Sequence, residues 1–308
     1  MKKISLMLLV LLSFMLMSCA NNKAEDKTPN IIVPSGTPSL AIMNYIKENS
    51  SSNVEVVEGS DPLIAAFSKE YYDVIIAPVN LGAKFYNSGS SSYILAKTIV
   101  WGNLYIASLE DITSIDDLNN QKLVVFGKNS TPDIITKIVL NAKENLNVEI
   151  EYVADVQTAN SLLVSGKAKY IVTAEPSISK IKDQKGIKTI DLQSEYSKVT
   201  NETSYPQAGI FIKKSQKNDK FTLDIVSKLK DSVNKTNSDK EGTAKNAVEL
   251  NETFNKLGED TLIKAIPNCH YMILENEKSA VNKYLQLLID LGLGAQVGGK
   301  LPDEEFFL

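Results

Sequence analysis

Two stretches of the chain share one order of apolar and polar positions. Residues 30–34 form a short β-branched run, which is followed by a loop of Ser, Gly, Thr and Pro and then by apolar residues at helical spacing. Residues 122–126 begin a second copy, which continues through the polar loop 127–133 into another helical pattern. Each copy therefore predicts a strand, a tight loop and a helix.

The likeness between the two stretches continues downstream. A helical pattern at residues 63–71 leads to the strand pattern 73–78, and a helical pattern at residues 159–166 leads to the strand pattern 170–176. The repeated order predicts two similar α/β lobes. The alternative is a chance succession of two common units, because proline often follows the start of a helix in any such unit.

Alternation of strands and helices predicts the class of fold. Right-handed crossovers give mainly parallel sheets flanked by helices. We expect further strands at residues 188–192 and 208–212, separated by a polar loop over residues 193–207. Four helical patterns follow, at residues 221–234, 242–257, 260–264 and 279–291. They need a sheet to cover, so we expect them to return to the first lobe.

This organisation defines the expected domains. Residues 30–106 and 207–308 would form lobe 1, and residues 107–206 would form lobe 2. The chain would cross between the lobes twice, through two hinge segments near residues 103–108 and 205–209.

The N-terminal residues read as an export signal. A basic start precedes the apolar residues 4–17, which are too few to span a bilayer comfortably. The sequence Leu16-Met-Ser-Cys19 resembles the lipobox of bacterial lipoproteins, and this resemblance implies that Cys19 carries lipid after residues 1–18 are removed. A cysteine placed there by accident is the alternative. Residues 19–30 are polar and predict a flexible tether.

Composition excludes several function classes. The net charge is −4 without a basic stripe, which argues against a nucleic-acid partner. Apart from Cys19 the only cysteine is Cys269, so we expect no disulfide framework and no cysteine-based metal site. We also expect no other metal and no cofactor. The chain contains no arginine, so any anion would be held without the planar guanidinium fork.

The motifs of the repeated units, taken in order, point to a known family. They include Pro34-Ser-Gly-Thr-Pro-Ser-Leu, Asp73-Val-Ile-Ile-Ala-Pro and Thr173-Ala-Glu-Pro176. The chain resembles the periplasmic-binding-protein-like (type 2) solute-binding lipoproteins of ABC importers, in the nitrate, sulfonate and thiamine-precursor group. The resemblance implies a monomer, outside the cytoplasm and anchored by lipid, that captures a small molecule and delivers it to an ABC permease driven by a cytoplasmic ATPase.

Two alternatives on the same scaffold remain open at this point. One is a ligand-sensing surface receptor or adhesin. The other is an enzyme of the same fold, for which the adjacent Cys269 and His270 offer a nucleophile and a base in principle. Adjacent side chains on a strand point to opposite faces, which argues against such a pair.

Candidate ligand contacts lie at the helix starts and at the two crossings. Helix starts present free amide donors at the carboxyl ends of the strands. The full set of candidates is Ser35, Gly36, Thr37, Pro38, Asn80, Trp101, Asn103, Tyr105, Ser130, Thr131, Glu175, Tyr205 and Gln207. Asn80 and Glu175 are expected to be opposing polar contacts, and the aromatic residues would stack on a planar ring. Helix capping and ordinary packing are the alternative roles of these residues.

The aromatic candidates and the missing arginine together favour one kind of ligand. We expect a planar heteroaromatic or vitamin-related metabolite. A ligand that carries an oxyanion would be bound less well, because this chain has no arginine to hold the oxyanion with two parallel hydrogen bonds.

Overall fold

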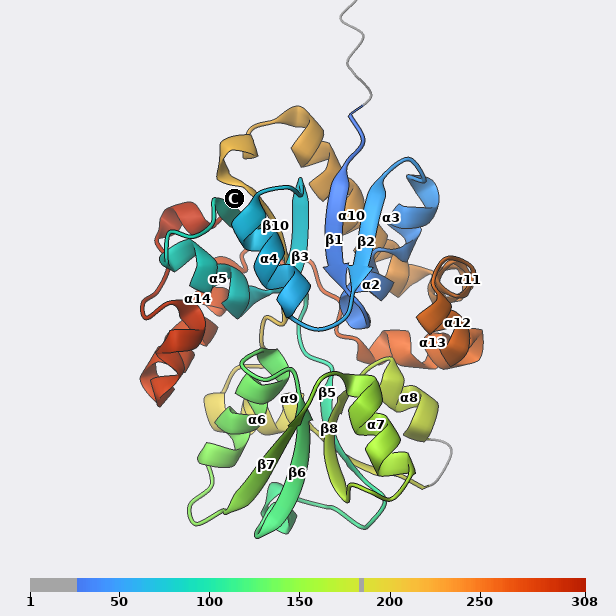
Figure 1. Ribbon diagram of the computed structural model, residues 1–308, viewed down its shortest axis with the longest axis vertical. Coiled ribbons are helices and arrows are strands. Elements are labelled where there is room, and N and C mark those ends of the chain that lie inside the picture. Colours follow the sequence, from blue (N-terminus) through green and yellow to red (C-terminus); the bar gives the residue numbers. More distant parts are fainter. Residues whose placement is uncertain (1–26, 183–185) are drawn as a thin grey trace, which may run out of the picture.

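Two five-stranded sheets divide the described residues into two lobes, one above the other (Figure 1). The computed structural model describes residues 27–182 and 186–308. The expected signal segment and Cys19 lie outside the described residues. In the described part no helix combines the length and the apolar character needed to cross a membrane.

The sheet of lobe 1 has the strand order β2-β1-β3-β10-β4. Its strands are β1 (Asn30–Pro34), β2 (Asn53–Val57), β3 (Val74–Pro78), β4 (Tyr93–Val100) and β10 (Ala208–Lys213). Strand β1 pairs in parallel with β2 and β3, whereas β10 pairs antiparallel with β3 and β4. Only β10 therefore runs against the other strands of this sheet.

The sheet of lobe 2 has the matching order β7-β6-β8-β5-β9. Its strands are β5 (Leu104–Ser108), β6 (Gln121–Phe126), β7 (Val148–Val153), β8 (Tyr170–Ala174) and β9 (Lys188–Asp191). Here β5 is the reversed strand, since it pairs antiparallel with β8 and β9. Both sheets are therefore mixed, although four strands of each run in one direction.

The reversed strands have a topological cause. Strands β5 and β10 are the first strands that the chain forms after each crossing between the lobes. A chain that arrives from the other lobe enters at the edge where the parallel strands end, so its first strand runs back against them. The crossings are short: residues 101–103 join β4 to β5, and residues 201–207 precede β10.

Helices cover both sheets (Figure 1). In the first part of lobe 1 they are α2 (Thr37–Ala41), α3 (Met43–Glu48), α4 (Asp61–Lys69) and α5 (Val79–Asn87). In lobe 2 they are α6 (Thr131–Asn141), α7 (Val156–Val164), α8 (Ser177–Lys182) and α9 (Leu192–Thr200). The expectation of a polar loop over residues 193–207 was wrong in its first half, because Asp191 caps α9 by accepting hydrogen bonds from the amides of Gln193 and Ser194.

The C-terminal helices lie against lobe 1. They are α10 (Lys220–Ser238), α11 (Lys240–Leu250), α12 (Glu252–Leu257), α13 (Glu259–Ala265) and α14 (Lys278–Leu288). Ile225, Leu229 and Val233 of α10 are buried in one apolar cluster with Ile31 and Val33 of β1. Burial of this apolar face against the sheet positions the returning segment.

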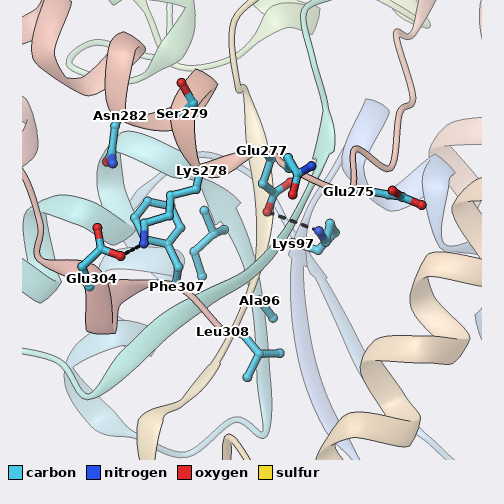
Figure 2. Close-up of a pocket in the computed structure, with 12 residues that line it drawn as sticks. Ala96, Lys97, Glu275, Glu277, Lys278, Ser279, Asn282, Glu304, Phe307 and Leu308 are labelled. Carbon is cyan, nitrogen blue, oxygen red and sulfur yellow. Dashed lines mark ion pairs between the residues drawn. The ribbon is translucent and has the colours of Figure 1, made fainter.

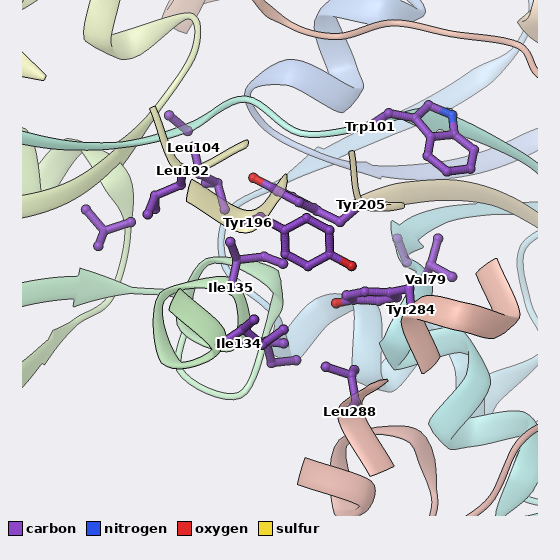
Figure 3. Close-up of a cluster of buried hydrophobic side chains, with 14 of the residues drawn as sticks. Val79, Trp101, Leu104, Ile134, Ile135, Leu192, Tyr196, Tyr205, Tyr284 and Leu288 are labelled. Carbon is purple, nitrogen blue, oxygen red and sulfur yellow. The ribbon is translucent and has the colours of Figure 1, made fainter. Parts of the chain in front are cut away.

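A second apolar cluster runs through both lobes and the crossings between them (Figure 3). It joins Val79 of lobe 1 to Ile134 of lobe 2 through Trp101, Leu104 and Tyr205. The apolar residues of the hinge are therefore part of a continuous core.

Candidate ligand-binding cleft

A cavity of about 150 Å³ lies between the two lobes. It is formed where strands of both sheets end and where the helices α4, α6 and α7 begin. Lobe 1 contributes Pro34, Ser35, Gly36, Pro38, Glu58, Gly59, Ser60, Leu63, Pro78, Gln207 and Ala208, and lobe 2 contributes Phe126, Gly127, Ser130, Thr131, Pro132, Ala154, Asp155, Val156 and Gln157. Ligands of open α/β sheets bind at this edge of the strands.

Six residues of the expected ligand set line the cavity. These residues are Ser35, Gly36, Pro38, Ser130, Thr131 and Gln207. They come from the two repeated loops and from the second crossing. The sequence repeat therefore locates the two halves of the cavity.

Two residues that line the cavity carry a side-chain oxygen that is buried away from the cavity surface. They are Thr131, with Oγ1, and Gln207, with Oε1. Thr131 Oγ1 lies beside the hydroxyl of Tyr284 in α14, whereas Gln207 Oε1 has no hydrogen-bond partner among the described residues. Neither oxygen is open to a ligand in the cavity as the structure stands.

Asn80, another expected ligand contact, lies outside the cavity and bonds within lobe 1. Its Nδ2 atom donates a hydrogen bond to the carbonyl oxygen of Gln296 (3.4 Å), while its Oδ1 atom is buried without a partner among the described residues. Asn80 does not line the cavity.

Thr37, Asn103 and Glu175 join the lobes directly instead of lining the cavity. The Thr37 hydroxyl donates to the carbonyl oxygen of Glu175 (2.6 Å), and Asn103 Nδ2 donates to the same hydroxyl. All three residues are buried. They form a polar contact that fixes the lobes in the closed arrangement.

The Glu175 carboxyl group has few partners in this contact. Its Oε1 atom accepts a hydrogen bond from Ser179 (3.1 Å), and Oε2 has no partner among the described residues. Burial raises the pKa of Glu175 to about 7 from 4.5, against the smaller lowering effect of its hydrogen bonds.

The aromatic candidates lie in the hinge and not on the cavity wall. Trp101 and Tyr205 are buried in the cluster that joins the lobes (Figure 3), and Tyr105 is partly buried on β5. The aromatic side chain that lines the cavity is Phe126, the last residue of β6. Its position at the end of a predicted strand was the available signal for this role.

Gln193 is a polar residue of the hinge that the sequence did not single out. Its Oε1 atom accepts hydrogen bonds from the amides of Asn103 (2.8 Å) and Leu104 (3.0 Å) and from the Tyr205 hydroxyl (2.7 Å). Helix α9 is thereby bound to both crossings.

A larger cavity of about 570 Å³ lies beside the edge strand β4, within lobe 1 alone (Figure 2). Several of its charged groups are engaged with one another: Lys278 pairs with Glu304, and Glu277 lies 3.9 Å from Lys97 Nζ. The cleft between the lobes is the stronger candidate site, because residues of both lobes line it at the ends of the strands.

Neither cavity offers a metal centre. Among residues 27–182 and 186–308, no group of three or more His, Cys, Asp or Glu side chains is arranged to hold a metal ion.

Comparisons with known proteins agree with this architecture. No protein-family model and no curated protein sequence matches the chain. A solved structure of an ABC transporter protein from Parabacteroides distasonis superposes with a TM-score of 0.74 at 24% identity, over 92% of this chain and 99% of that chain.

Two further solved structures give the same result. The periplasmic aliphatic sulphonate-binding protein of Escherichia coli matches with a TM-score of 0.65 at 12% identity, over 91% of this chain and 93% of that chain. The ligand-binding component of an ABC-type import system from Staphylococcus aureus, solved with zinc bound, matches with a TM-score of 0.68 at 13% identity, over 92% and 96%. The chain therefore has the α/β, two-lobed fold of type 2 periplasmic binding proteins.

Proposed function

We propose that this protein is an extracytoplasmic solute-binding protein that captures a small molecule between its lobes and delivers it to an ABC importer. The observation that carries the proposal is the cavity between the lobes, which is lined by the two repeated loops where strands of both sheets end. The solute would pass to a permease driven by a cytoplasmic ATPase. The protein would act as a monomer held at the membrane by lipid on Cys19.

The ligand proposed is a small planar molecule, heteroaromatic or vitamin-related. Phe126 offers a ring for stacking, and prolines and aliphatic side chains form much of the remaining wall. An apolar cavity of about 150 Å³ holds benzene in another protein, so one ring with few substituents matches this space.

A catalytic role for Cys269 is disfavoured by its surroundings. The thiol is fully buried and donates to the carbonyl oxygen of Ala265 (3.3 Å), and burial raises its pKa well above the usual range. A thiol that stays protonated is a poor nucleophile. Binding without turnover is therefore the proposed role.

A thermal-shift screen tests the proposal. Small planar heteroaromatic compounds, nitrate and taurine would be added to the protein, since a ligand that binds only the folded state raises its melting temperature. We expect a planar compound to raise it, and we expect Thr131→Val to abolish the effect. Thr98→Val is the matched control, because Thr98 is also fully buried but does not line the cleft. A shift that survives Thr131→Val, or the absence of any shift, would contradict the proposal.

Capture without transport would indicate the receptor alternative. Genes for a permease and an ATPase beside the coding sequence are expected, and uptake of the identified compound should stop when the protein is deleted. Normal uptake after deletion would contradict the importer role and leave a sensing role.

A further inference from the structure

The charged residues on the cavity wall are all acidic. Glu58 comes from the loop between β2 and α4 in lobe 1, and Asp155 comes from the loop between β7 and α7 in lobe 2. No lysine lines this cavity. Lys128, next to the lining residue Gly127, places its Nζ atom over the ring of Tyr152 (5.1 Å to the centroid). Each lobe therefore presents one carboxylate and no cation to the cleft.

The helix starts at the cavity do not compensate for these charges. A helix N-terminus attracts anions, but α4 and α6 already carry Asp61 and Asp133 in their first turns, and α7 is capped by Asp155. Helix α5 lacks an acidic residue there, and its first amide, that of Val79, donates to the Gln207 carbonyl oxygen (3.2 Å). Helix α2 also begins at the cavity without an acidic residue in its first turn, but it has only five residues and therefore a small dipole. The positive ends of α4, α6 and α7 are balanced by the protein itself.

Ionised carboxylates only accept hydrogen bonds, so Glu58 and Asp155 need N–H or O–H donors from a ligand that lies beside them. Carboxylate, sulfonate and nitrate groups are acceptors and cannot supply such a donor. Phe126 adds a ring face, which attracts a cation and repels an anion.

We propose that the ligand of the cleft is a planar molecule with a positively charged, N–H-bearing group, such as an amidinium or a protonated amine, and not an anion. Glu58 and Asp155 receive the N–H donors and balance the charge. This inference rests on the proposed function, because it assigns a chemical class to the solute of the same cleft.

Three isosteric probes test the charge separately from the shape. Benzamidine, benzamide and benzoate share one ring and one planar substituent but are cationic, neutral and anionic. Isothermal titration calorimetry at neutral pH should give the order benzamidine, benzamide, benzoate, with at least about tenfold weaker binding for benzoate than for benzamidine.

The acidic wall is then tested with one matched pair of variants. Glu58→Gln should weaken benzamidine binding by about two- to fivefold, as expected for an exposed ion pair, and should leave benzamide unchanged. Glu70→Gln is the control, since it removes an exposed carboxylate at the far end of α4, away from the cavity.

The possible failures are distinguishable. The inference is overturned if benzoate binds as tightly as benzamidine or more tightly. If Thr131→Val then abolishes benzoate binding, the cleft still holds a solute and the proposed function stands. Equal effects of Glu58→Gln and Glu70→Gln also overturn the inference. If none of the three probes binds, the inference fails and the thermal-shift screen decides separately on the proposed function.

Discussion

Glu277 shows how a single buried carboxyl group is held at the edge of the lobe 1 sheet (Figure 2). Its side chain is largely buried, and both oxygens accept from the Thr98 amide (3.0 and 2.9 Å), with Lys97 Nζ 3.9 Å away. Burial nevertheless dominates and raises the pKa of Glu277 from 4.5 to about 7. The ionised form is therefore disfavoured in the folded protein.

This pKa shift predicts how stability depends on pH. The folded state binds the Glu277 proton more tightly than the unfolded state does. The resulting contribution of Glu277 to the free energy of unfolding is complete below pH 4.5 and is lost as the pH rises through 7. The shift corresponds to about 3 kcal/mol. In urea unfolding from pH 4.5 to 8, the stability of the wild type minus that of Glu277→Gln should fall by about this amount. Glu70→Gln gives the baseline, and a difference independent of pH would contradict the prediction.

At the scale of elements, Gln193 connects α9 to both crossings between the lobes. Its side chain passes close to Gly102, where a Cβ atom would lie 2.6 Å from Gln193 Cγ. Gly102 also has φ +126°, a conformation that favours glycine. The hinge therefore depends on a glycine that leaves room for a buried amide.

Replacing Gln193 should destabilise the hinge. Gln193→Met keeps much of the volume but leaves two buried amides and the Tyr205 hydroxyl without their shared acceptor. We expect a loss of about 2–4 kcal/mol in urea unfolding. Gln286→Met changes the same residue type on the exposed side of α14, where Gln286 contacts Asp290, and should cost less than about 0.5 kcal/mol. Equal effects of the two variants would show that the hinge contacts are not significant.

The elements also show which parts of the fold the sequence predicts. The strands β1 and β6 and the helix starts after them follow from β-branched runs and Ser/Thr-Pro loops, because local pattern decides them. The reversal of β5 and β10 does not follow from local pattern, since it depends on where the chain enters each sheet. Trp101 and Tyr205 lie beside the crossings, but the sequence does not show which side of a crossing faces a ligand. Their buried positions depend on tertiary packing.

At the scale of the whole molecule, the described structure is closed. Lobe 2 contacts lobe 1 through the Thr37 hydroxyl and the Glu175 carbonyl oxygen, through Lys180 Nζ and the Leu257 carbonyl oxygen (2.9 Å), and through Gln296 and Asn129 (3.2 Å). The apolar cluster of the hinge contains residues of both lobes. It can stay intact when the lobes open only if they rotate about the two crossings. Contacts of this kind let small changes in free energy shift the population of open and closed forms.

The raised pKa of Glu175 predicts that this equilibrium depends on pH. Its carboxyl group lies in lobe 2 with Ser179 and Lys182, and it is covered from lobe 1 by Asn268 and Cys269. Burial raises its pKa to about 7, and opening would return the carboxyl group to water and lower that pKa. The closed form therefore holds the proton more tightly, so closure is favoured at low pH and weakened as the pH rises through 7.

Small-angle X-ray scattering of the ligand-free protein measures this effect. The radius of gyration of the wild type should increase between pH 5.5 and 8.5, because the ratio of closed to open forms falls about tenfold for each pKa unit that opening restores. Glu175→Gln cannot ionise and should keep one radius over this range, while Glu277→Gln, which removes a carboxyl group held by Lys97 and Thr98 of lobe 1, should behave like the wild type. The same radius for the wild type at both pH values would show that Glu175 stays buried when the lobes separate, and closure would then be independent of its charge.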